Sequence, residues 1–211
     1  MNLFSFDNLV LLLTGLAAIY LLWRFSQRYS TKKGLYDLYY MLGFTVLLVS
    51  GLLLIFLGFG ILASPLVLTV ASLIPFGISV GLVRQYFPQW TRPYLWFATL
   101  GLLAIAITSI GGMDSLKKVA VPLFHGVAGL IIFLGPFMTK KAVSGFSWVG
   151  IGGVLIGLGG IALAFLTMGR QLLFFSQDFV MMILAPLLLL MTLAFTWGFT
   201  RDILRPKARF K

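Results

Sequence analysis

The chain has 211 residues, of which 60% are hydrophobic and only 10% are charged, whereas a typical soluble domain carries about 25% charged residues. A soluble fold of this length cannot remove so much apolar surface from water, so the composition predicts an all-α, polytopic integral membrane protein. The net charge is +11, and cysteine and glutamate are absent. The absence of cysteine excludes thiol nucleophiles, disulfides and thiolate metal sites. Because so few catalytic residue types are present, we expect a protein that is not an enzyme.

Seven apolar stretches are long enough to cross a bilayer core of about 30 Å as helices. In chain order they are Leu9–Trp23, Leu38–Phe59, Pro65–Val83, Tyr94–Ile110, Val119–Met138, Trp148–Met168 and Phe179–Thr200. The second and third are divided at residues 60–64, because one helix through both would be far too long for a bilayer. We expect residues 1–211 to form a single seven-helix transmembrane domain, in which residues 201–211 are a short basic cytoplasmic tail.

The basic residues predict the orientation of these helices. No Lys or Arg precedes the first stretch, which therefore does not resemble a cleaved signal peptide. One side of the predicted bundle holds Arg24, Arg28, Lys32, Lys33, Arg84, Arg92, Lys140, Lys141, Arg201, Arg205, Lys207, Arg209 and Lys211, and the other side holds Lys117, Lys118 and Arg170. Since cytoplasmic loops are rich in Lys and Arg, we expect an N-terminus outside and a C-terminus inside, in the plasma or inner membrane.

The same asymmetry suggests the partners. Basic residues beside membrane helices contact anionic headgroups, so we expect membrane lipids and other membrane proteins as partners, and no nucleic acid. Tyrosines and tryptophans flank the basic loops, where they are typical of an interfacial belt. We expect this anchoring role for Trp23, Tyr29, Tyr36, Tyr39, Tyr40, Tyr86, Trp90, Tyr94, Trp96, Trp148 and Trp197.

His125 is the only ionisable residue inside the seven predicted stretches. It lies about six residues into the fifth, or roughly 9 Å along a helix, and an ionisable residue within a membrane indicates a functional site. As a cofactor-binding residue, it would be an axial ligand to haem or to a pigment. The alternative is a neutral histidine that is hydrogen-bonded to a Ser, a Thr or a backbone carbonyl. We expect this second role, and therefore no bound cofactor and no metal.

Prolines occur in three of the predicted helices that start at the outer side. Pro75, Pro122 and Pro186 are predicted to interrupt or kink these helices, because a proline has no N–H and its ring displaces the preceding turn. Kinks near the outer side could form a pocket that is rimmed by charged residues, namely Asp7, Asp114, Lys117, Lys118, Arg170 and Asp178. The alternative is that the prolines only shape the packing of the helices.

Glycines spaced four residues apart mark two predicted packing faces. They are Gly77 with Gly81 in the third stretch, and Gly153 with Gly157 in the sixth. Because small residues let helix backbones approach closely in a membrane, we expect these positions to pack helices within the protein. A contact with a partner protein is the second interpretation.

One local pattern resembles a known class of membrane receptor. The stretch Trp23-Arg24-Phe25 followed by residues 34–44 is similar to the first inner loop and second helix of the seven-helix sensor modules of bacterial receptor kinases and cyclases. The resemblance implies a sensor-like module with the N-terminus outside, which would signal through a separate partner, since the sequence contains no output domain.

Three functions are compatible with these observations. The first is a non-enzymatic module that acts by association, as a subunit of a larger membrane complex or as a sensor-like module. The second is a facilitator or channel for a small neutral or lipid-like molecule, whose path would use Thr69, Ser72, Ser79, Thr108, Ser109, Thr192 and Thr196. The third is a haem- or pigment-binding subunit that uses His125. Coupled transport is disfavoured, because no carboxylate lies at the middle of a predicted helix.

Overall fold

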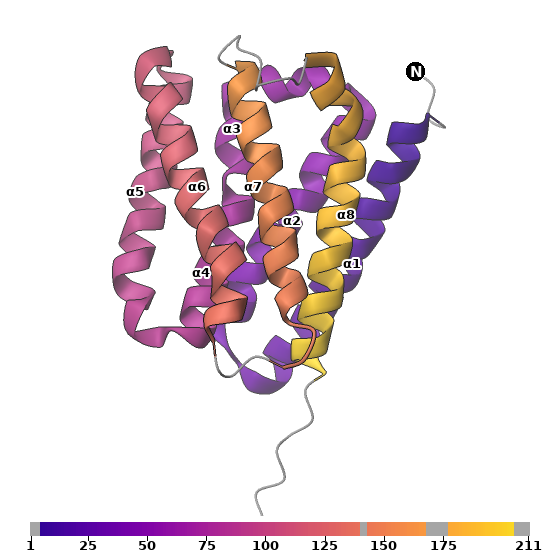
Figure 1. Ribbon diagram of the computed structural model, residues 1–211, viewed down its shortest axis with the longest axis vertical. Coiled ribbons are helices and arrows are strands. Elements are labelled where there is room, and N and C mark those ends of the chain that lie inside the picture. The colour runs from indigo at the N-terminus through magenta and orange to yellow at the C-terminus, as the bar shows by residue number, and fades with distance from the viewer. Residues whose placement is uncertain (1–4, 140–142, 168–176, 205–211) are drawn as a thin grey trace, which may run out of the picture.

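The computed structural model describes residues 5–139, 143–167 and 177–204 of the chain, and it is all-helical in that part (Figure 1). The long helices are α1 (Phe6–Lys32), α2 (Leu35–Leu57), α5 (Thr91–Ile110), α6 (Asp114–Met138), α7 (Ser147–Thr167) and α8 (Gln177–Ile203). Two shorter helices, α3 (Pro65–Ala71) and α4 (Leu73–Tyr86), follow one another, and the 3-10 turns η1 (Phe59–Ala63) and η2 (Pro88–Trp90) lie before α3 and after α4.

The described helices have the length and composition of a polytopic membrane protein, as predicted. Six candidate spans occur in the described residues: Phe6–Lys32, Leu35–Leu57, Pro65–Tyr86, Pro88–Ile110, Asp114–Met138 and Phe179–Ile203. Helix α7 contributes a further apolar stretch, Ser147–Gly160. Each predicted stretch coincides with a helical region, although α2 ends before Gly58, whose φ of +74° is unfavourable for other residues.

Two helices extend well beyond their predicted ends into the basic segments. Helix α1 continues from the predicted end at Trp23 to Lys32, because no glycine or proline interrupts the sequence before Gly34, and Lys33 then ends the helix in the left-handed conformation. Helix α8 includes residues 201–203, which were predicted to begin the cytoplasmic tail. The remaining tail, residues 205–211, lies outside the described residues.

The three prolines affect their helices differently. The third span is broken at Ser72, between α3 and α4. Pro75 explains the break, because it cannot donate a hydrogen bond to the carbonyl of Ala71. Pro122 and Pro186 do not interrupt their helices, since α6 and α8 continue through them, and a kink at either residue stays a prediction. Other helical hydrogen bonds on either side maintain the helix at such positions in a bundle.

Six of the described helices form a closed ring, and α5 lies outside it. Around the ring, α1 packs on α2, α2 on α4, α4 on α6, α6 on α7, α7 on α8, and α8 on α1. Helix α5 lies at the edge of the bundle, against α3, α4 and α6 (Figure 1). Both ends of the described chain lie on this ring, with the start of α1 at one end of the bundle and the end of α8 at the opposite end, which we call the basic end.

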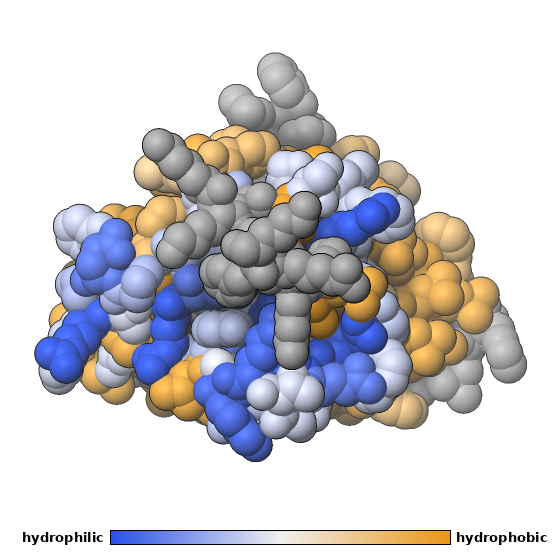
Figure 2. All heavy atoms as spheres, turned by 90° about the horizontal axis from the view of Figure 1, so that it is seen from below, coloured by the Kyte–Doolittle hydropathy of each residue, from blue (hydrophilic) through white to orange (hydrophobic). Residues whose placement is uncertain are grey.

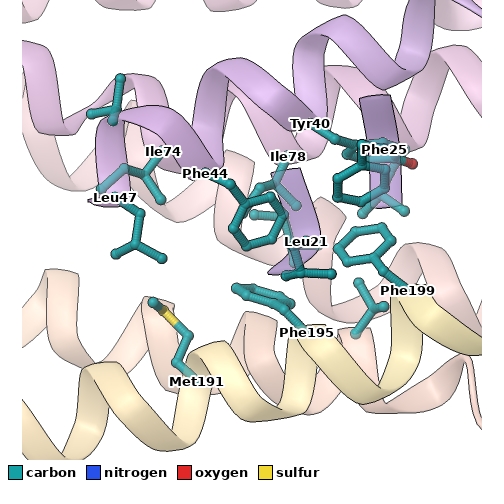
Figure 3. Close-up of a cluster of buried hydrophobic side chains, with 14 of the residues drawn as sticks. Leu21, Phe25, Tyr40, Phe44, Leu47, Ile74, Ile78, Met191, Phe195 and Phe199 are labelled. Carbon is teal, nitrogen blue, oxygen red and sulfur yellow. The ribbon is translucent and has the colours of Figure 1, made fainter. Parts of the chain in front are cut away.

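Aromatic side chains of α1, α2 and α8 pack together inside the ring of helices (Figure 3). Phe25 of α1, Tyr40 and Phe44 of α2, and Phe195 and Phe199 of α8 are all completely buried. Their ring centroids are 4.7 Å apart for Tyr40 and Phe199 and 5.0 Å apart for Phe25 and Tyr40, distances at which aromatic pairs attract one another. This cluster fixes the relative positions of α1, α2 and α8.

The tryptophans and tyrosines separate into two groups. All five tryptophans are exposed on the surface of the bundle, which is the placement expected of interfacial anchors. The interfacial prediction is wrong for Tyr40, which is completely buried, and for Tyr94, whose hydroxyl donates to Ser79 Oγ at 2.8 Å inside the bundle. Their hydroxyl groups have partners within the protein, so they do not depend on interfacial water.

Candidate functional site

A buried cluster of charged side chains connects three helices at the basic end. Arg28 of α1 contacts Asp37 Oδ1 of α2, with Nε at 2.8 Å and Nη2 at 2.6 Å. Its Nη1 donates to Asp202 Oδ2 of α8 at 2.5 Å. The exposed fractions are 4% for Arg28, 0% for Asp37 and 6% for Asp202. These values place both ion pairs inside the bundle, in contrast to the hydrophilic side chains gathered on the surface of the same end (Figure 2).

Neutral polar side chains extend this cluster to α4. Gln85 Nε2 donates to Asp202 Oδ2 at 2.9 Å, and the hydroxyl of Tyr86 donates to Asp202 Oδ1 at 2.7 Å. The hydroxyl of Tyr40 donates to Gln85 Oε1 at 2.8 Å. The four helices α1, α2, α4 and α8 therefore meet in one hydrogen-bonded network, which we call the polar cluster: Arg28, Asp37, Tyr40, Gln85, Tyr86 and Asp202.

The electrostatics of the polar cluster depend on Arg28. With both carboxylates ionised, the three charged groups sum to one negative charge. The guanidinium also packs on aromatic rings, with its Cζ 5.0 Å from the centroid of Tyr36 and 5.4 Å from that of Phe25, which adds a cation–π attraction. Asp37 lies in the first turn of α2 and Arg28 lies near the end of α1, and both positions are favourable for the helix dipoles.

The sequence prediction missed this cluster. The apolar stretches alone place Arg28 in an inner loop and Asp202 in the tail, and they predict His125 as the only ionisable side chain within the helices. The structure shows that Arg28, Asp37 and Asp202 also lie inside candidate spans. The helices continue past the apolar residues that marked them, and this extension brings the three charges together.

Gly77 and Gly81 bring α4 against α2 beside the polar cluster. A Cβ at Gly77 would lie 2.7 Å from the carbonyl oxygen of Tyr39 and 2.8 Å from the backbone nitrogen of Gly43, and a Cβ at Gly81 would lie 2.5 Å from the Tyr40 ring. No side chain fits at either position without movement of α2. The close approach holds Tyr40 next to Gln85, its partner in the polar cluster.

The glycines of α7 have two different surroundings. A Cβ at Gly153 would lie 2.6 Å from the backbone nitrogen of Phe133 in α6, so this glycine permits close packing. Around Gly157, in contrast, a Cβ would have no atom within 4 Å. The expectation of a packing role therefore fits the surroundings of Gly153, whereas Gly157 faces a hollow between α6 and α7.

This hollow has a volume of about 430 Å³ and lies between α4, α6 and α7. We call it the lateral hollow, and it is lined by Pro75, Val121, Pro122, His125, Gly126, Gly129, Leu130, Phe133, Gly153, Val154, Ile156, Gly157, Leu158 and Gly160. Leu130 is 55% exposed and Leu158 is 53% exposed. Because these two residues lie on the outer surface of α6 and α7, the hollow opens sideways, toward the lipid in a membrane.

A second, smaller hollow lies inside the helix ring. Its volume is about 130 Å³, and all six ring helices contribute to its wall. We call it the central hollow; its lining includes Leu11, Thr14, Ser50, Gly51, Pro75, His125, Gly159, Gly160 and Met191. Pro75, His125, Ile156 and Gly160 belong to the walls of both hollows. His125 therefore lies where the lateral hollow meets the interior of the ring.

His125 itself lies deeper along its helix than predicted. Helix α6 begins at Asp114, five residues before the predicted start, so His125 is about 16 Å along it, near the middle. Its Nδ1 is enclosed and has no hydrogen-bond partner among the described residues. The expected Ser, Thr or carbonyl partner is thus not seen at this nitrogen, and a haem or pigment at His125 stays a prediction, which an absorption spectrum tests.

Of the other residues of the predicted pocket, those that the structure describes do not all lie together. Pro75 and Pro122 line the lateral hollow, whereas Pro186 lies on α8 beside Ala185, which packs with Val10 and Leu11 of α1. Asp114 and Lys117 pair with each other at 2.7 Å on the surface, at the start of α6. The side chains of Arg170 and Asp178 lie outside the described residues.

Comparisons with protein-family models, with curated proteins and with solved structures find no match to this chain. The fold and composition define the class as a polytopic, all-helical membrane protein.

Proposed function

We propose that this protein is a non-enzymatic membrane module that holds a small apolar ligand between its helices and acts by association with other membrane proteins. The lateral hollow is the observation that supports this function. It is of the size of small-molecule sites, which occupy about 300 to 1,000 Å³, and it opens where an apolar ligand would arrive from the bilayer. This role agrees with the sensor-like module that the sequence resembles.

The arrangement of hydroxyl groups favours this function over a facilitator. Six of the seven candidate path residues bond to their own helices: Thr69 donates to Pro65 O, Ser72 to Leu68 O, Ser79 to Pro75 O, Thr108 to Ala104 O, Thr192 to Leu188 O and Thr196 to Thr192 O. The hydroxyl of the seventh, Ser109, is enclosed and has no partner among the described residues. A hydroxyl satisfied by its own helix offers little to a passing solute. None of the seven candidate residues lines either hollow.

The distribution of basic residues supports an orientation in which the basic end faces the cytoplasm. Lys32, Lys33, Arg92 and Arg201 are exposed at this end, where anionic headgroups would attract them. Compartment-specific reporters fused to the two termini test this arrangement. We expect the N-terminal reporter outside and the C-terminal reporter inside, and reporters in one compartment would contradict it.

Purification in a mild detergent followed by native mass spectrometry tests the ligand. We expect a bound apolar molecule in the wild type and its loss in Gly157→Leu, which places a side chain in the lateral hollow. Gly60→Leu is the matched control, because Gly60 also has no atom within 4 Å of a Cβ but lines neither hollow. Equal retention in both variants would contradict the proposed site.

The same purification tests association. A protein that copurifies with the wild type would support action by association, and a monomer without a partner would count against it.

A further inference from the structure

We infer that the lateral hollow selects an apolar molecule with one hydroxyl or carbonyl group, and that this group hydrogen-bonds to the imidazole of His125. The inference rests on the proposed function and names the class of its ligand. It follows from four observations: the chemistry of the wall, the unpaired Nδ1 of His125, the position of its imidazole ring and the direction in which the hollow opens.

Among the described residues, the wall of the lateral hollow contains one side chain that can form hydrogen bonds. Apart from His125, the lining residues are glycine, proline, valine, leucine, isoleucine and phenylalanine. A charged or strongly polar ligand would lose its water there without gaining partners, which is unfavourable by several kcal/mol for each polar group. The wall therefore suits a ligand that is apolar over most of its surface.

The histidine supplies a single specific contact. A neutral imidazole has one nitrogen that donates and one that accepts a hydrogen bond, and Nδ1 is enclosed without a partner among the described residues. The imidazole ring lines both hollows, and Nε2, unlike Nδ1, is not one of the enclosed unpaired atoms of the described residues. We therefore assign the ligand's hydrogen bond to Nε2. A simple acyl chain would fill the hollow but leave Nε2 unpaired, whereas an alcohol or a ketone would pair with it.

Access to the hollow agrees with this ligand class. The mouth is formed by the apolar side chains of Leu130 and Leu158 on the lipid-facing surface of α6 and α7. A molecule that enters there is already dissolved in the bilayer, and it exchanges acyl-chain contacts for contacts with the wall. Because the apolar parts gain little in this exchange, the hydrogen bond to His125 decides which molecules remain bound.

The test compares a linear alkanol with the alkane of the same length, both added to the full chain in lipid nanodiscs. We expect the alkanol to bind the wild type about fivefold more tightly, which is the effect of one net hydrogen bond. In His125→Leu the preference for the alkanol should disappear, and the alkane should bind at least as tightly, because the wall then offers the hydroxyl no partner. Since a variant in the middle of α6 can perturb folding, a second readout uses the wild type alone.

The second readout uses the fact that His125 is the only histidine of the chain. Protein labelled with ¹⁵N-histidine and purified through a histidine-free tag gives one imidazole in nitrogen NMR spectra. The alkanol should shift its signals and the alkane should not. Equal affinities and unshifted signals in the wild type would overturn the inference.

The Gly157→Leu variant separates this failure from a failure of the proposed function. If both probes bind the wild type equally well and Gly157→Leu prevents binding of both, the hollow binds ligands and only the role of His125 is wrong. If neither probe binds the wild type, the proposed function fails together with the inference.

Discussion

Replacement of Arg28 by methionine is the most direct test of the polar cluster. Methionine keeps much of the length of the side chain but removes the charge, so Asp37 and Asp202 lose the cation that lies 2.6 Å and 2.5 Å from them. Removal of one partner from a buried ion pair costs about 3 to 5 kcal/mol, because the remaining charge is uncompensated. Since the cluster lies near the end of the bundle, where water can reach it after relaxation, we expect about 3 kcal/mol.

This loss corresponds to a change of roughly a hundredfold in the folding equilibrium. It can be measured by SDS titration of the protein in mixed micelles, with near-ultraviolet circular dichroism as the signal. That signal depends on the fixed packing of Phe25 and Tyr40, whose rings lie beside Arg28, and of Phe199, which packs on both rings. The midpoint of unfolding should shift to a clearly lower SDS fraction.

Two further variants make the result interpretable. Arg24→Met removes the same charge one turn earlier on α1, where Arg24 hydrogen-bonds only weakly to Gln27, with an N–O distance of 3.4 Å, and lies over Trp23; we expect a cost of about 0.5 kcal/mol. The triple variant Arg28→Met, Asp37→Asn, Asp202→Asn should recover more than half of the loss, because no buried charge is left unpaired. Equal costs for Arg28→Met and Arg24→Met would refute this account of the cluster.

Three other variants test separate parts of the packing in the same titration. Tyr86→Phe removes the donor to Asp202 Oδ1 and should cost about 1.5 kcal/mol, the lower end for hydrogen bonds to charged groups; no loss would mean that another donor replaces it. Gly77→Ala should cost about 1 to 3 kcal/mol, because its Cβ would meet the backbone of α2, whereas Gly157→Ala should be neutral or stabilise the helix by up to about 1 kcal/mol; the opposite order would contradict the assigned surroundings. Phe199→Ala should cost about 3 kcal/mol through lost packing, compared with little change for Leu193→Ala on the exposed side of α8.

The helices themselves could be predicted from the sequence because a bilayer imposes a simple requirement. Each span needs about 20 apolar residues, and the runs that meet this requirement coincide with helical regions of the structure. Helix ends could not be predicted in the same way, since hydropathy locates the apolar core and not the end of backbone hydrogen bonding. The end of α1 at Lys32 is determined by Lys33 and Gly34, nine residues after the apolar run.

The polar cluster was missed for this reason, although one signal was available. The buried positions of α1 include Leu11, Thr14, Ala18, Leu21, Phe25 and Arg28, which alternate in steps of three and four residues. Such spacing marks one face of a helix, and its continuation to Arg28 indicates that this arginine faces the core. Its partners Asp37 and Asp202 could not have been chosen from the sequence, because Asp202 is 174 residues away.

The lateral hollow shows what residue spacing can and cannot predict. Gly153 and Gly157 follow the same small-residue pattern, yet one contacts α6 and the other faces open space. The difference arises in three dimensions, from the course of α6 beside α7. The sequence could identify His125, Pro75 and Pro122 as unusual, but it could not show that the three residues line one hollow.

The two halves of the bundle are therefore stabilised in different ways, and α7 spans both. Toward the basic end, a Cβ at Gly152 would lie 2.5 Å from the ring of Phe195, so α7 packs tightly on the aromatic cluster. Farther along the same helix, Gly157 and Gly160 border the lateral hollow, where packing against α6 is incomplete. Lipid removes the hydrophobic drive for helices to associate, so packing and polar contacts must hold them together. Arg28 and the aromatic rings around it supply these contacts at one end, which allows the other half to keep a hollow without loss of the fold.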